Sequence, residues 1–318
     1  MLTDSDLRTQ LPFVLNETSL DFLGEKYSGK VRDNYTCGDV RYLITSDRLS
    51  CFDVVVTTVP FKGEVLNRVA AHWFARTNDI LPNHLLDMPD PAVMVVKNCE
   101  VLQIEVIVRA YITGSAWRDY EAGREISGVR LAPGLRASQK LPEPILTPSV
   151  KAPKGQHDEP ISEREILAGN LVPAALWEQI REAAFGLFAI GSRRAEERGL
   201  ILVDTKYEFG LYKGKLTLVD EIHTLDSSRY WIRATYQDLF EKGAAPQMLD
   251  KEPTRQWLLS KGYKGEGKVP EFTDDHRVEI SRHYIDSAEK IMGETFTAEV
   301  GPTHDRIERR LKGYRLPA

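Results

Sequence analysis

Apolar and polar positions in the first hundred residues recur mostly with the period of β-strands. Val40, Tyr42 and Ile44 occupy every second position, and the segment 53–59 is β-branched and apolar. In 65–74 the apolar residues instead recur with helical spacing, which predicts one helix with a single apolar stripe. A small sheet with a helix packed on it is the simplest architecture. The strands are expected at 40–46, 53–59, 93–97 and 101–111.

The pattern changes beyond about residue 109. Proline and glycine cluster in 133–160, which has no usable periodicity; because it also holds apolar residues, we favour an ordered functional flap over a disordered linker. Helices follow. Ser162 and Glu165 form a capping box, and helical apolar spacing recurs in 173–198 and 277–292.

Between these helices the sequence predicts a β-hairpin. Its strands are 200–210 and 215–221, and Gly214 can supply the positive φ that such a turn requires. The order of elements indicates an α+β protein with two lobes. We place a strand-rich lobe at 1–105 and a larger, mixed α/β lobe at 106–318.

Composition narrows the class of protein. The 318 residues are 42% hydrophobic and 28% charged, which excludes disorder, and the net charge of −5 lacks the positive excess of a nucleic-acid or membrane-surface binder. The start has no signal-peptide pattern, and no apolar run approaches the roughly 18 residues of a membrane span. Cys37, Cys51 and Cys99 are odd in number and outside CxxC spacing. We therefore expect a cytoplasmic protein.

Common catalytic motifs are missing from the sequence. There is no GxGxxG, GxSxG or HExxH, so a Rossmann dehydrogenase, an α/β-hydrolase and a zincin lose their main support. The segment 262–268 has the spacing of a Walker A loop. Val269 stands where Ser or Thr should hold magnesium, however, and 255–260 looks helical, so we favour a surface turn.

The most informative charges lie in the predicted hairpin. Asp204, Lys206 and Glu208 alternate, so in a strand they share one face. The second strand brings Asp220 beside Glu208, and two close carboxylates repel unless a cation or proton lies between them. Magnesium uses one or two carboxylates with waters and phosphate oxygens. The alternative is a solvated face with mutual salt bridges; because the charges interrupt apolar runs, we favour a metal and anion site.

Three weaker clusters also suit phosphate. In 28–33 a glycine lies beside two cations, which suits phosphate binding and equally an exposed hairpin turn. Arg109 followed by 113–115 suits a phosphate monoester, or else a capped helix start at Ser115 with Arg109 paired to a nearby acid. The segment 226–229 has the same ambiguity, because Asp and Ser also cap the helix expected to follow.

Taken together, six segments resemble the phosphoribosylaminoimidazole-succinocarboxamide synthase (SAICAR synthetase) family. They occur in the family's order across about three quarters of the chain, and Cys51, where the family usually has a small residue such as Ala, is a minor departure. The resemblance implies an antiparallel, β-rich ATP lobe, a larger mixed lobe and an active-site cleft between them. The segments are 28–35, 45–53, 108–120, 141–162, 201–210 and 219–231.

The family implies an ATP-dependent amide ligase of de novo purine biosynthesis. It would condense carboxyaminoimidazole ribonucleotide (CAIR) with L-aspartate, using ATP and Mg²⁺, to give SAICAR, ADP and phosphate. The expected partners are these small molecules, with neither nucleic acid nor membrane, and a monomer is slightly favoured. Alternatives are another ATP-dependent kinase or ligase, although HRD and DFG motifs are missing, and a non-catalytic nucleotide-binding protein.

The resemblance also implies roles for individual residues. ATP would be bound by Ser28, Gly29, Lys30, Arg32 and Glu105, with Glu105 near the adenine. Glu208 and Asp220 would hold magnesium and, with Lys206, form the catalytic set. The substrate's 5′-phosphate would be bound by Arg109, Ser115, Lys206 and Arg229. Further substrate contacts, including those to aspartate, are expected among Asp47, Arg48, Lys151, His157 and Asp158.

Overall fold

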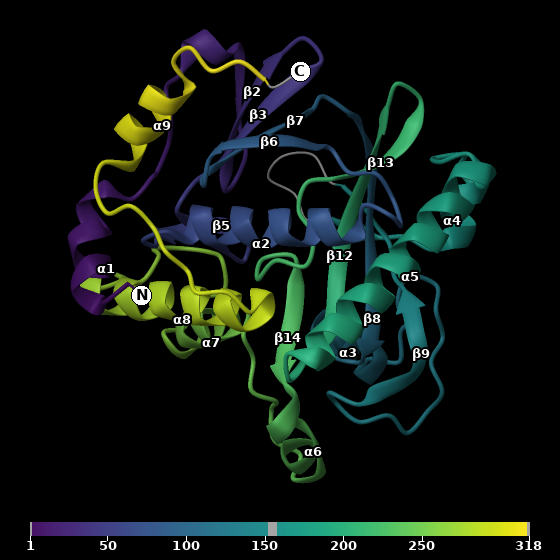
Figure 1. The fold of residues 1–318 in the computed structure, drawn as a ribbon. Helices are drawn as coiled ribbons and strands as arrows, with labels where there is room; N and C mark the ends of the chain where they lie inside the picture. Colours follow the sequence, from purple (N-terminus) through teal and green to yellow (C-terminus); the bar gives the residue numbers. More distant parts are fainter. Residues whose placement is uncertain (1, 152–157, 317–318) are drawn as a thin grey trace. The chain divides into compact units, whose positions relative to one another are not determined.

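The computed structural model describes residues 2–151 and 158–316, and the chain forms two compact units. Unit 1 combines Met1–Phe74, His84–Asn98 and Asp250–Ala318. Unit 2 combines Ala75–Asn83 and Cys99–Leu249. Both contain antiparallel sheet and helices, which confirms the α+β class (Figure 1).

Unit 1 is built on a five-stranded antiparallel sheet with the order β1-β2-β3-β7-β6. Its expected members at 40–46 and 93–97 are present, and the consecutive residues 93–96 of the second are all buried, so both faces of the sheet are covered there. A separate hairpin pairs β4 (Arg48–Cys51) with β5 (Val54–Thr58). The sheet consists of β1 (Glu25–Ser28), β2 (Arg32–Cys37), β3 (Val40–Thr45), β6 (Leu85–Asp90) and β7 (Val93–Lys97).

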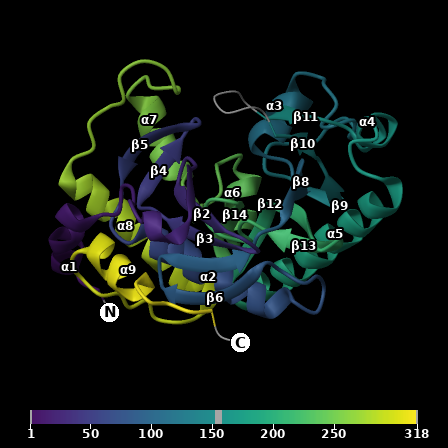
Figure 2. The ribbon, with the colours of Figure 1, turned by 90° about the horizontal axis from the view of Figure 1, so that it is seen from above.

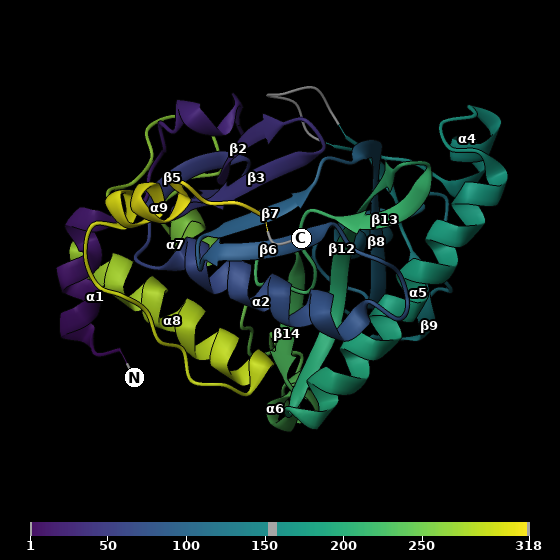
Figure 3. The same cartoon turned by 45° about the horizontal axis from the view of Figure 1, so that its top comes forward.

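The helices of unit 1 come from both ends of the chain. Helix α1 (Asp4–Gln10) lies beside α8 (Asp274–Met292), as Figures 1 and 3 show. The helix predicted at 65–74 is α2 (Lys62–Thr77). The Walker-like segment 262–268 is irregular and follows α7 (Glu252–Ser260), as expected for a surface turn. The remaining elements are α9 (Thr303–Leu311) and two 3₁₀ turns, Leu11–Phe13 and Asp21–Leu23.

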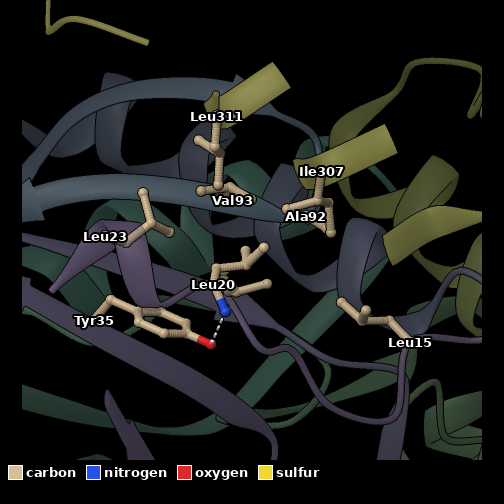
Figure 4. Close-up of a cluster of buried hydrophobic side chains, with 9 residues drawn as sticks. Leu15, Leu20, Leu23, Tyr35, Ala92, Val93, Ile307 and Leu311 are labelled. Carbon is tan, nitrogen blue, oxygen red and sulfur yellow. Dashed lines mark hydrogen bonds between the residues drawn. The ribbon is translucent and has the colours of Figure 1, made fainter. Parts of the chain in front are cut away.

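A hydrophobic cluster ties the C-terminal helix to the sheet (Figure 4). Ile307 and Leu311 of α9 pack with Tyr35 and Val93, and all four are at most 2% exposed. The Leu20 amide donates to the Tyr35 hydroxyl at 3.1 Å, so the one polar atom of that ring is paired. Burying each aliphatic side chain contributes about 1.5–3 kcal/mol to folding.

The packing of residues 250–318 with unit 1 differs from the predicted lobe 106–318. Arg306 of α9 donates to Glu64 of α2 at 2.5 Å and to Asp90 at the end of β6 at 2.9 Å, and all three side chains are buried. The apolar stripe of a helix predicts that it packs on a sheet but not on which one. These long-range contacts determine that α9 packs in unit 1.

Unit 2 is built on a larger antiparallel sheet with the order β11-β10-β8-β12-β13; β9 also pairs with β8, and β14 with β12. The two long central strands are β8 (Glu100–Tyr111) and β12 (Leu200–Tyr212). Helix α5 (Ala174–Glu197), predicted at 173–198, lies along this sheet (Figure 2). The other strands are β9 (Lys140–Leu146), β10 (Ser149–Val150), β11 (Glu159–Pro160), β13 (Lys215–Val219) and β14 (Ser228–Ile232).

Local signals in unit 2 are largely confirmed. Lys213 and Gly214 have φ of 51° and 75°, so a two-residue turn joins β12 to β13. The capping box of Ser162 and Glu165 begins α4 (Glu163–Ala168). The described parts of 133–160 are ordered and add three strands to the sheet. The remaining helices are α3 (Gly114–Glu121) and α6 (Arg233–Glu241).

Of the two alternatives left open for 226–229, the helix cap does not form. The segment 226–229 leads into strand β14, and helix α6 begins only at Arg233. Pairing with β12 overrides the capping propensity of Asp226 and Ser227. Among the described residues, a helix long and apolar enough to cross a bilayer does not occur.

Replacing Arg306 should test how α9 is joined to the rest of unit 1. Arg306→Met leaves Glu64 buried without its guanidinium, so we expect the free energy of unfolding to fall by about 3–5 kcal/mol. Arg309→Met, in the same helix but 69% exposed, should change it by about 0–1 kcal/mol. Denaturant unfolding measures both; equal effects would contradict this account.

Candidate active site

The pairing of β8 with β12 gathers charged side chains on one face of the sheet in unit 2. Glu208 lies opposite Glu105, and Asp204 lies opposite Arg109. Residues directly opposite in an antiparallel pair share a face, and so do alternate residues along a strand. All four side chains are less than 10% exposed. The predicted alternation of Asp204, Lys206 and Glu208 therefore holds in the structure.

At one end of this face, two lysines and two glutamates form a compact cluster. Lys206 Nζ lies 2.5 Å from Glu105 Oε1 and 3.0 Å from Glu208 Oε1. Lys151 donates to the other carboxylate oxygen of Glu208. Both oxygens of Glu208 thus accept from ammonium groups. We call Glu105, Lys151, Lys206 and Glu208 the lysine–glutamate cluster.

The cluster separates the protonation states of its two glutamates. Burial would raise the pKa of Glu208, but Lys206 and Lys151 outweigh it and hold that pKa well below its usual range. Burial raises the pKa of Glu105 to about 7, with the charge of Glu208 adding to it and Lys206 opposing it. Burial lowers the pKa of Lys206, yet the surrounding carboxylates raise it well above its usual value. Glu208 is therefore ionised and Lys206 charged at neutral pH.

Asp220 follows β13 directly and adds a carboxylate near this cluster. Its neighbour Val219 is the residue opposite Glu208, and its own φ is 64°, in the left-handed region. The charge of Asp220 also raises the pKa of Lys206. Among residues 2–151 and 158–316, no group of three or more His, Cys, Asp or Glu residues could hold a metal. A pair of carboxylates still fits magnesium, which completes its shell with water and phosphate oxygens.

At the other end of the face, Asp204 holds two arginines together. Its Oδ2 accepts from Arg109 Nη1 at 2.8 Å and from Arg229 Nη1 at 2.6 Å. Arg109 also donates to Thr147 Oγ1 at 2.9 Å and lies 3.5 Å from Ser115 Oγ. Two guanidinium groups around one carboxylate leave one net positive charge. We call Arg109, Asp204 and Arg229 the arginine pair site; its chemistry suits a phosphate monoester.

Gly114 completes the arginine pair site. It has φ of 59°, and a Cβ there would lie 2.7 Å from Arg229 Nη2. Any side chain would therefore displace the guanidinium group. Thr113, which precedes α3, makes no side-chain capping bond, and Ser115 directs its hydroxyl toward Arg109. The alternative from the sequence therefore holds in part: a helix begins here without a side-chain cap, and Arg109 is paired to an acid, Asp204.

In unit 1, the predicted phosphate loop is the tight connection between β1 and β2. The Gly29 amide donates to the Arg32 carbonyl at 2.8 Å, and Lys30 Nζ lies 2.5 Å from Asp53 Oδ1. The Lys30 side chain is 53% exposed. Ser28 ends β1 and Arg32 begins β2, so the loop is an exposed hairpin turn that presents a cation. The hairpin turn expected as one alternative is confirmed, and phosphate binding by this loop stays a prediction.

Asp47 and Arg48 are built into unit 1, whereas the sequence placed them in contact with substrate. Asp47 is 3% exposed and accepts from the Leu15 amide at 2.7 Å and the Gly63 amide at 3.0 Å. Burial raises its pKa to about 7, against these two bonds. Arg48 Nε donates to the Lys30 carbonyl at 2.8 Å. Arg48 therefore supports the phosphate loop from inside the unit.

Four other expected residues have different outcomes. Glu105, predicted near the adenine, lies in the lysine–glutamate cluster because its register opposite Glu208 decides its place. Asp158 is exposed, and its charge contributes to the raised pKa of Glu105. His157 lies outside the described residues. Lys151 contacts Glu208 directly, which its position in a proline-rich segment could not predict.

Comparison with known proteins places these features in a family. A family model described as SAICAR synthetase matches residues 25–271. A phosphoribosylaminoimidazole-succinocarboxamide synthase from Bacteroides fragilis is 47% identical over 308 residues, which are 94% of this chain and 98% of that protein. One from Legionella pneumophila is 45% identical over 307 residues, covering 93% and 97% respectively.

Solved structures give the same result for the fold. SAICAR synthase from Saccharomyces cerevisiae, complexed with SAICAR, has a TM-score of 0.79 and 32% identity, covering 89% of this chain and all of that one. A SAICAR synthetase in complex with ADP has a TM-score of 0.66 and 22% identity, covering 86% of this chain and all of that one. The second likeness shows the fold alone.

Replacing Gly114 should reveal the arginine pair site. Gly114→Ala displaces the guanidinium of Arg229, so we expect the affinity for a phosphate-bearing substrate to fall about tenfold or more, as measured by calorimetric titration. Gly123→Ala is the matched control: φ there is 72°, but nothing lies within 4 Å of an added Cβ. Both variants carry similar backbone strain. Equal losses of affinity would contradict the assignment.

Proposed function

The chain belongs to the SAICAR synthetase family, and from this premise we propose how its residues divide the work of the reaction. The protein is an ATP-dependent carbon–nitrogen ligase of purine biosynthesis. It condenses CAIR with L-aspartate and forms SAICAR, ADP and phosphate. The roles of individual residues given below are our proposals.

The reaction requires activation of a carboxylate, which is a poor acyl donor. A carboxylate oxygen of CAIR attacks the γ-phosphorus of ATP and ADP leaves, which gives an acyl phosphate. The amine of aspartate then attacks the acyl carbon, phosphate leaves and the amine loses a proton. Neither step uses a protein nucleophile, so the missing nucleophile motifs agree with this route. Positioning and compensation of charge are the protein's main contributions.

The observation that carries our proposal is the arrangement of two charged sites on one strand face. Asp204 and Glu208 are four residues apart on β12, which is about 13 Å at roughly 3.3 Å per residue. A ribonucleotide bound along this face would place its 5′-phosphate at the arginine pair site. Its base carboxylate would then lie toward the lysine–glutamate cluster. Ser115 and Lys206 would donate further hydrogen bonds to the bound ribonucleotide.

Glu208 and Asp220 are the residues that we propose to hold magnesium. Lys151 and Lys206 keep Glu208 ionised, and a carboxylate must be ionised to bind a cation. When bound, the metal would neutralise charge on the transferring phosphoryl group. Glu105 bonds to Lys206 at this end of the face, and its place near the adenine stays a prediction.

The ATP phosphates would be bound by the loop of Gly29, Lys30 and Arg32 in unit 1. Lys30 is exposed at its tip, and Arg48 supports the loop through the carbonyl oxygens of Gly29 and Lys30. Ser28 would border this site. Contacts from His157 and Asp158 to aspartate stay predictions, as do the cytoplasmic location and the monomeric state.

One assay separates the proposed reaction from its alternatives. ADP release with ATP and magnesium should require both CAIR and L-aspartate. Release that is indifferent to aspartate would favour a kinase or another ligase. Binding of ATP without any release of ADP would favour a non-catalytic nucleotide-binding protein.

Glu208→Gln should abolish turnover. The amide keeps the size of the side chain but loses the charge that faces the metal and both lysines. ADP release should therefore fall at least about 1000-fold, with the fold intact by circular dichroism. Glu143→Gln, at an exposed position of β9, is the control and should keep full activity. A Glu208→Gln enzyme with near-normal turnover would refute the metal assignment.

A further inference from the structure

A hydrogen bond lies directly behind the lysine–glutamate cluster, on the opposite face of β12. Tyr207, between Lys206 and Glu208, points away from them, and its hydroxyl lies 2.7 Å from His223 Nε2. Both side chains are fully buried. Neither residue takes part in the proposed chemistry.

His223 belongs to the loop between β13 and β14, which also carries Asp220. Three links tie this loop and the first residue of β14 to consecutive residues of β12. Thr205 Oγ1 lies 2.7 Å from Ser228 Oγ, and the Lys206 amide donates to the Ser227 carbonyl at 2.9 Å. The bond from Tyr207 to His223 is the third link and the nearest to Asp220 in sequence.

A glycine of α5 leaves room for the His223 imidazole. Gly191 lies inside α5, which runs along β12 (Figure 1), and a Cβ there would come within 2.4 Å of His223 Cε1. Glycine inside a helix costs about 1 kcal/mol relative to alanine. A residue with that cost, placed against the ring, indicates that the position of His223 is constrained by its surroundings.

The backbone of the loop depends on such support. His223 and Asp220 have φ of 53° and 64°, in a region that residues other than glycine rarely adopt and that persists only when the surroundings hold it. The Tyr230 hydroxyl donates to the His223 carbonyl at 3.0 Å. His223 is thus held through both its ring and its backbone.

The bond joins two neutral groups across the physiological range. Burial lowers the pKa of His223 to about 3. The imidazole is therefore no proton carrier near neutral pH, and the link keeps its form while the charges on the opposite face change during the reaction.

We propose that Tyr207 and His223 are positioning residues that set the separation of Asp220 from Glu208 and thereby the affinity of the site for a divalent cation. Glu208 is anchored by its strand, whereas Asp220 reaches the site on a loop. The Tyr207–His223 bond connects this loop to the strand residue adjacent to Glu208. This inference rests on the proposed assignment of Glu208 and Asp220 as metal ligands.

Tyr207→Phe removes only the hydroxyl and tests the inference without the catalytic reaction. Manganese binding to the full-length protein with bound ADP, followed by electron paramagnetic resonance, should weaken about threefold to tenfold. Affinity for ADP without metal should stay unchanged. Tyr236→Phe is the control, because its hydroxyl donates to the Ser138 carbonyl in the same unit, and it should leave manganese affinity unchanged.

Variants of His223 provide a second test, which stays informative if Tyr207→Phe misfolds. His223→Gln can still bond to the Tyr207 hydroxyl and should retain more manganese affinity than His223→Leu, which cannot. Unchanged manganese affinity in Tyr207→Phe, or equal affinity in the two His223 variants, would overturn the inference, whatever the change in thermal stability. If Glu208→Gln itself bound manganese like wild type, the metal assignment would fail instead.

Discussion

The antiparallel pairing of β8 with β12 is the constraint on which the rest of the candidate site depends. Its register brings Glu105 opposite Glu208 and Arg109 opposite Asp204, in the middle of a sheet where charged groups are otherwise rare. A buried charge is tolerated only when it is paired. Each end of the face meets this requirement with a local balance of charges: two arginines lie around Asp204, and two lysines with Glu105 lie around Glu208.

The same balance explains how an acidic chain can bind phosphorylated substrates. The net charge of −5 describes the whole sequence, yet the arginine pair site retains one positive charge after Asp204 is counted. The lysine–glutamate cluster keeps the Glu208 carboxylate ionised and holds two ammonium groups beside it. Charges that are already fixed in place need little rearrangement when the substrate arrives, which is how electrostatic preorganisation lowers a barrier.

Local patterns in the sequence predicted much of the fold and of the candidate site. Alternation predicted the shared face of Asp204, Lys206 and Glu208, and Gly214 predicted the hairpin turn that brings in Asp220. Contacts between distant segments could not be predicted from the sequence. These are the packing of 250–318 with unit 1, the place of Glu105 in the cluster and the internal bonds of Asp47 and Arg48. Propensity failed where sheet pairing competed with it, as in 226–229. Tyr207 and His223 lie in two of the matched segments but had no predicted role, and their hydrogen bond and the close approach of Gly191 emerge only in the fold.

The central claim is that one face of β12 carries two separate sites. The arginine pair site recognises phosphate, and the lysine–glutamate cluster serves the chemical step. Calorimetric titration of SAICAR and of its dephosphorylated nucleoside into Arg229→Met and Glu208→Gln tests it most directly. The account predicts that Arg229→Met loses most of the preference for the nucleotide, about tenfold to a hundredfold, because a charge-assisted bond is removed. Glu208→Gln should keep that preference. A Glu208→Gln protein that loses it, or an Arg229→Met protein that retains it, would contradict the claim.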